Sequence, residues 1–232
     1  MTTVSCIIPA HNEAERISSV LEAIYDHPLL SEIIVVQNFS TDNTSEVVKR
    51  FIKQKKTSKI KLLEERTNAG KSYAMYKGAE KSKSDILLFI DADLVGIKRQ
   101  NITNILNPVL KNKADLSLGV RGDTIFFFNI FRIDPIGGES AISKKLFFQM
   151  PDCRRTKFAI ESLMNDFLVK GKKRITIVNM PNVKNTKKSE KKGFIRGIYD
   201  NLLMIQNIFS KVSIIKFIKN YRYFIKNAKR VN

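Results

Sequence analysis

The sequence predicts an α/β protein in which a mostly parallel β-sheet is flanked by helices. Four short apolar runs have the length and composition of buried strands, and they cover residues 4–9, 32–36, 60–63 and 86–90. Segments expected to be helical separate these runs, at residues 13–25, 44–51 and 71–81. Alternation of strand and helix is typical of a parallel sheet with right-handed crossovers.

Local signals define these elements and the ones that follow. Pro9 ends the first strand, since proline donates no hydrogen bond to a sheet. Thr41 or Asp42 can cap the helix after the second strand. Farther along, we expect helices at residues 101–110 and 144–150, and strands at residues 115–121 and 172–178. The aromatic run at residues 125–131 is either core or flap, or a surface that faces lipid or a partner subunit.

Length and composition limit the class of protein. A chain of 232 residues with 43% hydrophobic residues can form one large domain plus an appendage, and it is globular and not disordered. Its two cysteines, Cys6 and Cys153, make no disulfide framework, so we expect reduced intracellular thiols. We see no signal peptide and no apolar run long enough to span a bilayer, and we therefore expect a cytoplasmic protein.

Two carboxylates directly follow the strand predicted at residues 86–90. Asp91 and Asp93 are separated by one residue, where the chain leaves the sheet. Ligands of open α/β sheets bind at the carboxyl ends of strands, and two such carboxylates can share Mg²⁺ or Mn²⁺. That cation would in turn hold a diphosphate. The alternative is a solvated turn after a core strand.

Four motifs, each following a strand, would line one edge of this sheet. They are Ile-Pro-Ala-His-Asn-Glu at residues 8–13, Ser-Thr-Asp-Asn-Thr at 40–44 after an apolar run, Asn-Ala-Gly-Lys at 68–71 and Phe-Ile-Asp-Ala-Asp at 89–93. In order and separation they resemble the family 2 glycosyltransferases, which have the GT-A fold and use nucleotide-sugar donors. The resemblance implies a GT-A nucleotide-sugar-binding domain over residues 1–192.

The resemblance also implies roles for single residues. The residues that would shape the nucleotide pocket are Pro9, Asn12 and Glu13. Lys71 would approach the base or the phosphates, although it can also be a solvated lysine at the start of a helix. Asp91 would contact the ribose or metal-bound waters, and Asp93 would ligate the metal directly.

The turn after the second strand departs from the family pattern. Members usually have Asp, then Asp or Asn, then Gly, whereas this chain has Gln37, Asn38 and Phe39. Gln37 can still hydrogen-bond the base or ribose but carries no charge. Because Phe39 replaces a glycine, we expect this turn to avoid a positive φ angle. The departure leaves the identity of the base open.

The second half supplies candidates for the sugar, the acceptor and the metal. Gly138 and Glu139 resemble a family segment that approaches the donor sugar, and the alternative is a plain turn before a helix. Glu161 occupies the place of a carboxylate that deprotonates the acceptor hydroxyl in inverting members. In retaining, glucosyl-phosphoglycerate-synthase-like members it would instead bind the acceptor, and outside both roles it is a surface residue. Asn185 stands where members often carry a histidine ligand, and its amide oxygen can ligate Mg²⁺ weakly.

Basic residues are concentrated in the last third of the chain. Residues 1–150 contain 21 Lys+Arg against 17 Asp+Glu, whereas residues 151–232 contain 20 against 5. Residues 193–232 combine an apolar helical stripe with a basic face, which is typical of amphipathic helices in a membrane interface. This tail would contact an anionic membrane from its cytoplasmic side, or dock on the domain, or pair with a second copy in a homodimer. Just before it, Lys187, Lys188 and Lys191 would contact phosphates or form a solvated run.

The expected function is metal-assisted sugar transfer from a UDP- or GDP-sugar. The acceptor would be lipid-linked, a glycan or a phosphorylated small molecule. Two other classes remain open: a non-catalytic nucleotide-sugar-binding module, suggested by Gln37, Phe39 and Asn185, and a nucleic-acid-binding protein, suggested by the basic tail. Nucleic-acid binders interleave aromatic and basic residues on an exposed sheet or groove, whereas here they fall on a helical stripe, so we expect no nucleic-acid partner.

Overall fold

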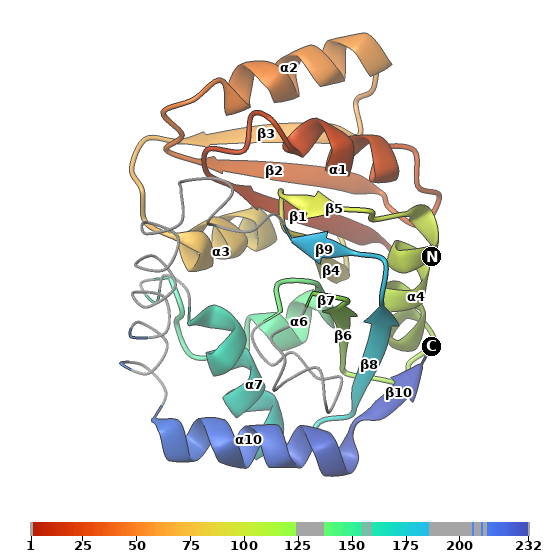
Figure 1. Ribbon diagram of the computed structural model, residues 1–232, viewed down its shortest axis with the longest axis vertical. Coiled ribbons are helices and arrows are strands. Elements are labelled where there is room, and N and C mark those ends of the chain that lie inside the picture. Colours follow the sequence, from red (N-terminus) through yellow and green to blue (C-terminus); the bar gives the residue numbers. More distant parts are fainter. Residues whose placement is uncertain are drawn as a thin grey trace.

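The computed structural model describes residues 2–123, 137–154, 156, 159–185, 206, 210 and 213–231. In these ranges, eight strands form one sheet in the order β10-β8-β6-β7-β4-β1-β2-β3 (Figure 1). Their bounds are β1 Val4–Ala10, β2 Glu32–Asn38, β3 Ile60–Glu65, β4 Ile86–Phe89, β6 Leu116–Arg121, β7 Ser140–Ser143, β8 Ile175–Met180 and β10 Lys229–Val231. Only β7 runs antiparallel to its neighbours β4 and β6, so the prediction of a mostly parallel sheet is confirmed.

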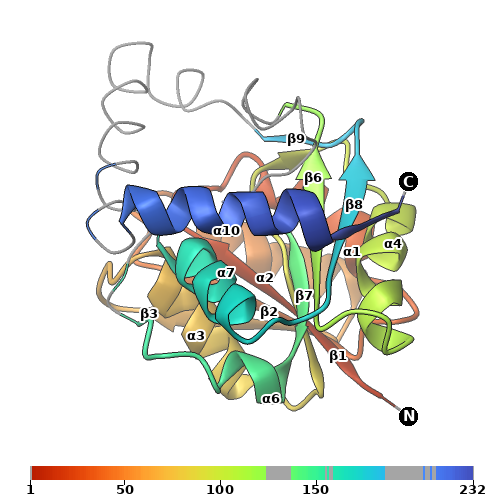
Figure 2. The same ribbon diagram turned by 90° about the horizontal axis from the view of Figure 1, so that it is seen from below.

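Helices cover both faces of the sheet, and strand side chains alternate between two cores. The helices that pack on one face are α1 Ile17–Ile24, α2 Thr44–Lys55 and α4 Arg99–Leu110. Those on the other face are α3 Lys71–Lys81, α6 Lys144–Phe147, α7 Ile160–Lys170 and α10 Ile214–Asn227 (Figure 2). In β1, for example, Cys6 and Ile8 enter the first core and Ile7 enters the second. This period of two is expected for a strand that is buried on both faces.

The first helix begins four residues later than predicted. Residues 14–16 form a turn instead, in which the backbone N–H groups of Arg16 and Ile17 both donate to the carbonyl of Glu13 at 3.0 Å. The second helix extends beyond residue 51 to Lys55 and ends at Lys56, which has a φ of 49°. Asp42 acts at its start, since Oδ1 accepts a hydrogen bond from the N–H of Thr44 at 3.0 Å.

Strand β7 was not predicted, because residues 136–142 were interpreted as a segment that approaches the donor sugar, with a plain turn before a helix as the alternative. The strand has the sequence Ser-Ala-Ile-Ser, which contains no apolar run. It forms because it lies between β4 and β6 and bonds to both. Its small side chains fit the buried centre of the sheet, where Ser140 and Ala141 are buried. Tertiary context therefore decided this element, and local propensity did not.

The C-terminal segment is partly helix and partly sheet. Residues 214–227 form helix α10, but the last described residues form strand β10 and pair in parallel with β8. The expectation of a helical tail over residues 193–232 is therefore wrong at residues 229–231. The proposed boundary at residues 192/193 and the aromatic run at 125–131 lie outside the described residues. In the part of the chain that the structure describes, no helix is long and apolar enough to cross a membrane.

His27 is a buried residue of the fold, between the turn after α1 and the start of α4. Its side chain is 1% exposed, and Nδ1 accepts the N–H of Leu29 at 3.2 Å. Nε2 therefore carries the proton and donates to the carbonyl of Arg99 at 3.2 Å. Burial lowers the pKa of His27. The histidine fixes the turn after α1 to the start of α4.

Candidate functional site

The loops that follow β1 and β2 are joined to each other at the carboxyl edge of the sheet. Asn12 Oδ1 accepts the N–H of Thr41 at 2.8 Å, and Ser40 Oγ accepts the N–H of Asn12 at 3.0 Å. The N–H of Glu13 donates to Thr44 Oγ1 at 2.9 Å. Two of the predicted nucleotide-pocket residues, Asn12 and Glu13, thus lie in one hydrogen-bonded unit, and Pro9 precedes them in β1 beside Val36.

The turn at Phe39 keeps a positive φ without a glycine. Phe39 has φ 53°, so the expectation that this residue would avoid the left-handed region is wrong. A hydrogen bond between His11 Nδ1 and the carbonyl of Asn38, at 2.9 Å, holds the preceding peptide. Gln37 and Asn38 are buried at the end of β2, whereas the side chain of Phe39 is 48% exposed. A bulky residue in this conformation requires a well-determined surrounding structure.

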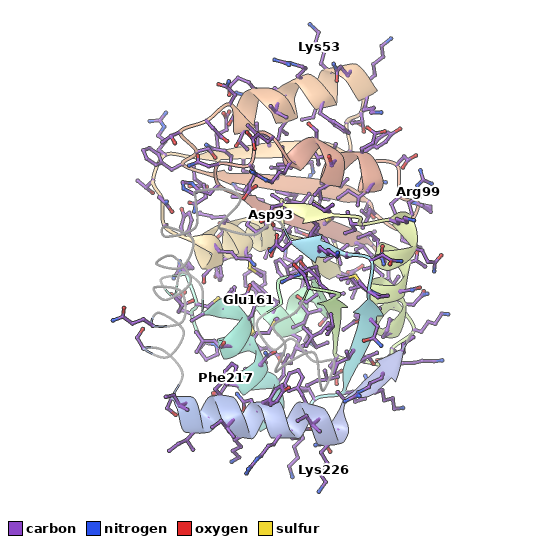
Figure 3. All side chains as sticks on the ribbon, viewed as in Figure 1. Lys53, Asp93, Arg99, Glu161, Phe217 and Lys226 are labelled. Carbon is purple, nitrogen blue, oxygen red and sulfur yellow. The ribbon has the colours of Figure 1, made fainter. Side chains whose placement is uncertain are left out.

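Two predicted site carboxylates contact the ammonium group of a third predicted site residue, Lys71. Lys71 Nζ lies 2.7 Å from Asp91 Oδ1 and 2.9 Å from Glu161 Oε1. Lys71 is the first residue of α3, and Asp91 follows β4. Glu161 lies in the first turn of α7 (Figure 3). Gly70, directly before Lys71, has φ 91°, a conformation that residues with a side chain rarely adopt. The fold therefore joins the proposed donor side and the proposed acceptor side.

Burial and charge set the protonation of this trio. Burial alone would lower the pKa of Lys71, but the charges of Asp91 and Glu161 outweigh it and raise that pKa, so the ammonium persists. Burial raises the pKa of Glu161, and Lys71 opposes that shift only in part. The Glu161 side chain is 6% exposed. A buried carboxylate with a raised pKa is suited to accept a proton or a hydrogen bond from an acceptor hydroxyl.

Gly138 and Glu139 have different surroundings, although they are adjacent. A Cβ at position 138 would overlap both carboxylate oxygens of Asp91, so only glycine lets the backbone pass this close. Glu139 is fully buried, and its Oε2 accepts from Arg121 Nη1 at 2.7 Å. The structure thus brings Gly138 to the trio and holds Glu139 against β6. Contact of Gly138 or Glu139 with a donor sugar stays a prediction.

Asp93 and Asn185 are brought together by a second, two-stranded sheet. Strand β5 (Leu94–Val95) pairs antiparallel with β9 (Lys184–Asn185), and Leu94 lies opposite Asn185. Asp93 directly precedes β5 and is 9% exposed (Figure 3). Asn185 Oδ1 is buried and has no hydrogen-bond partner among the described residues.

These two residues fit a divalent cation of the magnesium type. Carboxylate and amide oxygens are hard ligands, and a cation would satisfy the buried Oδ1 of Asn185. No group of three or more His, Cys, Asp and Glu side chains within the described ranges could hold a metal by itself. A bound cation would therefore need further oxygen ligands, such as those of a diphosphate.

Two further residues lie at this edge of the sheet, one at the end of β6 and one just after it, and neither was predicted as part of the site. Arg121 pairs with Glu139, and Asp123 Oδ2 accepts the N–H of Asn185 at 2.8 Å, which fixes the backbone of the metal candidate. The signal that singled out Asp91, a carboxylate directly after a buried strand, was also present at Asp123. The lysines at positions 187, 188 and 191 lie outside the described residues.

Known proteins match this chain in sequence and in structure. The model of the family described as Glycosyl transferase family 2 matches residues 5–165. Glucosyl-3-phosphoglycerate synthase from Mycobacterium tuberculosis, solved with Mn²⁺, UDP-glucose and phosphoglyceric acid, superposes with a TM-score of 0.72. At 21% identity, the match covers 90% of this chain and 79% of that chain, and it confirms the fold.

Two curated relatives match in sequence. The 4,4'-diaponeurosporenoate glycosyltransferase of Staphylococcus haemolyticus is 37% identical over 96 residues, which are 40% of this chain and 24% of the relative. The dolichyl-phosphate beta-glucosyltransferase of Dictyostelium discoideum is 29% identical over 133 residues, which are 53% of this chain and 41% of the relative. The matched region thus spans less than half the length of either relative.

Proposed function

Because the chain belongs to glycosyl transferase family 2, we propose that it is a glycosyltransferase that moves a sugar from a nucleotide-sugar to an acceptor hydroxyl or phosphate. The observation that carries the proposal is the contact of Lys71 with both Asp91 and Glu161. Asp91 belongs to the predicted donor site and Glu161 to the predicted acceptor site. One lysine thus links the two halves of a transfer reaction.

Each residue has a distinct task in this proposal. The joined loops that contain Asn12 and Glu13 hold the nucleoside together with Gln37 at the end of β2. Gly138, whose backbone passes against Asp91, contacts the donor sugar. Asp93 and Asn185 hold Mg²⁺ or Mn²⁺, and the cation, when bound, offsets the negative charge that develops on the departing nucleoside diphosphate.

Lys71 and Glu161 act on the charges that move during transfer. Lys71 stays protonated and can share its three donors between the carboxylates and a phosphate oxygen. Glu161 faces the acceptor and takes its proton or orients it. The two roles of Glu161 correspond to inversion and retention of the sugar configuration.

The acceptor and the location follow from the relatives and from the charge. The Mycobacterium structure contains UDP-glucose and a phosphorylated acid, and the Dictyostelium relative is named for dolichyl phosphate. These names favour a UDP-sugar donor and a phosphorylated or lipid-linked acceptor, with a glycan as a further possibility. The net charge of +19 favours a cytoplasmic enzyme that meets an anionic membrane peripherally, with or without pairing into a homodimer.

A thermal-shift screen tests the proposal. UDP-, GDP-, dTDP- and CDP-sugars are each added with Mn²⁺ or with EDTA, and a ligand at ~100 times its Kd adds about 2.7 kcal/mol of stability. We expect a shift with one nucleotide class that needs Mn²⁺ and is lost in Asp93→Ala.

The matched control is Asp85→Ala, which removes an exposed carboxylate at the other end of strand β4. It should retain the shift. If every nucleotide-sugar fails to stabilise the wild type, or if stabilisation persists in Asp93→Ala, the proposed donor and metal sites are wrong.

A further inference from the structure

The outward face of α10 combines exposed isoleucines with basic residues. At its N-terminal turns, Ile215 is 80% exposed, Ile214 57% and Ile218 47%. The exposed basic residues of the helix are Lys216, Lys219, Arg222 and Lys226. Residues 201–232 contain seven Lys and Arg and no Asp or Glu, so no acidic residue of this segment neutralises the face.

The opposite face of α10 is already occupied. Tyr221 and Phe224 are buried against the core that includes α7, and Asn220 Nδ2 donates to Asp166 Oδ1 of α7 at 3.5 Å. At its C-terminal end the chain continues into β10, which pairs with β8. The helix is thus fixed to the domain by one side (Figure 2). Its isoleucines and basic residues remain exposed.

We propose that this outward face binds the surface of an anionic lipid bilayer, with α10 parallel to the membrane plane. Ile214, Ile215 and Ile218 enter the boundary between headgroups and acyl chains, while the basic residues contact the headgroups. Apolar side chains rimmed by long basic ones are suited to such an interface, because lysine stems lie along it while their charges stay in water. The choice of a bilayer over a protein partner rests on charge complementarity across the whole length of the helix.

Membrane contact through α10 would also determine where sugar transfer takes place. The helix that α10 packs on, α7, contains Glu161 in its first turn. Membrane binding through α10 therefore holds the acceptor side of the domain near a lipid surface. This step rests on the proposed function, whereas the binding itself does not.

Co-sedimentation of the full chain with vesicles tests the proposal. We expect binding to vesicles of phosphatidylcholine mixed with phosphatidylglycerol, and little to phosphatidylcholine alone. Each basic residue near an anionic surface contributes about fivefold to partitioning, so Lys219→Gln, Arg222→Gln and Lys226→Gln together should weaken binding about a hundredfold. Ile215→Asp should weaken it further without unfolding the chain, since Ile215 is 80% exposed.

A matched triple variant controls for net charge. Arg50→Gln, Lys53→Gln and Lys56→Gln remove the same charges from exposed sites on and directly after α2, at the far end of the molecule (Figure 3). This variant should bind anionic vesicles like the wild type. Equal loss in both triple variants would overturn the proposal, because attraction would then be unspecific.

Two further outcomes would overturn the proposal. One is equal binding to both kinds of vesicle. The other is a wild-type dimer in solution that Ile215→Asp dissociates without any change in vesicle binding, since the face would then be a contact between copies. Nucleotide-dependent thermal shifts, measured in parallel, report on the donor site alone, so failure of membrane binding is distinguished from failure of the proposed function.

Discussion

Two buried glutamates at opposite ends of the sheet show how a structural carboxylate differs from a functional one. Glu32 begins β2 at the amino end, and its Oε1 accepts from Ser5 Oγ at 2.6 Å and from the N–H of Lys83 at 2.7 Å. Its Oε2 pairs with Lys61. Glu161 lies at the carboxyl edge and is held by Lys71. Both side chains are less than a tenth exposed.

The two carboxylates differ in how well the fold stabilises their charge. Burial alone would raise the pKa of Glu32, but hydrogen bonds from Lys61, Ser5 and Lys83 outweigh it and lower that pKa. For Glu161, burial dominates and the pKa is raised. Polar contacts thus satisfy the charge of Glu32 within the fold, whereas the charge of Glu161 is kept at a higher free energy. Such a group is available for a ligand.

The largest expected effect is a difference in turnover between substitution of Lys71, the partner of Glu161, and substitution of Lys61, the partner of Glu32. Lys71→Met removes the ammonium group that joins Asp91 to Glu161, and we expect turnover of the stabilising nucleotide-sugar to fall about a hundredfold or more. Lys61→Met is the matched control, since Lys61 also pairs with a buried glutamate but its side chain is 46% exposed. Its turnover should stay within about twofold of wild type. A comparable loss in both variants would show that the two clusters do not differ in function.

The glutamates themselves should differ in stability. Glu32→Gln weakens charge-assisted hydrogen bonds from Ser5 and Lys83, and we expect the free energy of unfolding to fall by about 2 kcal/mol. Glu161→Gln should leave it unchanged or slightly higher at pH 7, while it lowers turnover. Urea denaturation measures both. A large loss of stability in Glu161→Gln would assign that residue to the fold.

Gly138→Ala tests how closely the trio is packed. Because the new methyl group would overlap the carboxylate of Asp91, that side chain must move away from Lys71. We expect turnover to fall about tenfold, since small displacements of a reacting site are costly. Gly171→Ala is the control, because the Cβ there would come no closer than 3.3 Å to a neighbour. Normal turnover in Gly138→Ala would place the trio outside the site.

The smallest effect is a difference in pH dependence. The pKa of Glu32 is lowered from 4.5. The ionised Glu32 therefore stabilises the fold fully above pH 4.5, and this stabilisation is lost as the pH falls through the lowered pKa. The pKa of Glu161 is raised, so the wild type loses stability as pH rises from 4.5 through the raised value. Denaturation at several pH values should therefore show Glu32→Gln approaching wild type in acid. The free energy of unfolding of Glu161→Gln should rise relative to that of the wild type, by less than about 1 kcal/mol, as the pH approaches neutrality.

Much of the structure of residues 4–93 was predictable, because the signals there are local. Apolar runs located β1, β2, β3 and β4, and the motif positions singled out Lys71 and Asp91 as candidate site residues without indicating that they contact each other. Glu161 was chosen by position in the chain, but its ion pair with Lys71 joins residues 90 positions apart, and no local pattern encodes such a contact. The Glu32 cluster was missed for the same reason, since Glu32 was seen only as the start of a strand.

The expectations that proved wrong were those in which the local sequence alone was used to infer a backbone conformation or an element. The absence of glycine at position 39 was interpreted as a change of turn, yet hydrogen bonds around the loop keep φ positive in Phe39. Strand β7 lacked an apolar run because its partners on both sides supply the burial. In each case neighbours distant in sequence decided the outcome.

The position of β7 has a consequence for how this fold can diversify. The chain leaves the sheet after β6 and returns at β7, and both ends are fastened to the framework: the N–H of Gly122 donates to Val183 and that of Gly119 to Glu139. Residues 124–136 therefore start and finish at fixed points, one of them next to the carboxylate of Asp91. The register of β6 and β7 is set by their pairing with each other and with β8 and β4, so a change of sequence between these fixed points need not shift any of these strands. Evolution can thus vary the sequence between these two points without moving the strands that flank Asp91 and Glu139.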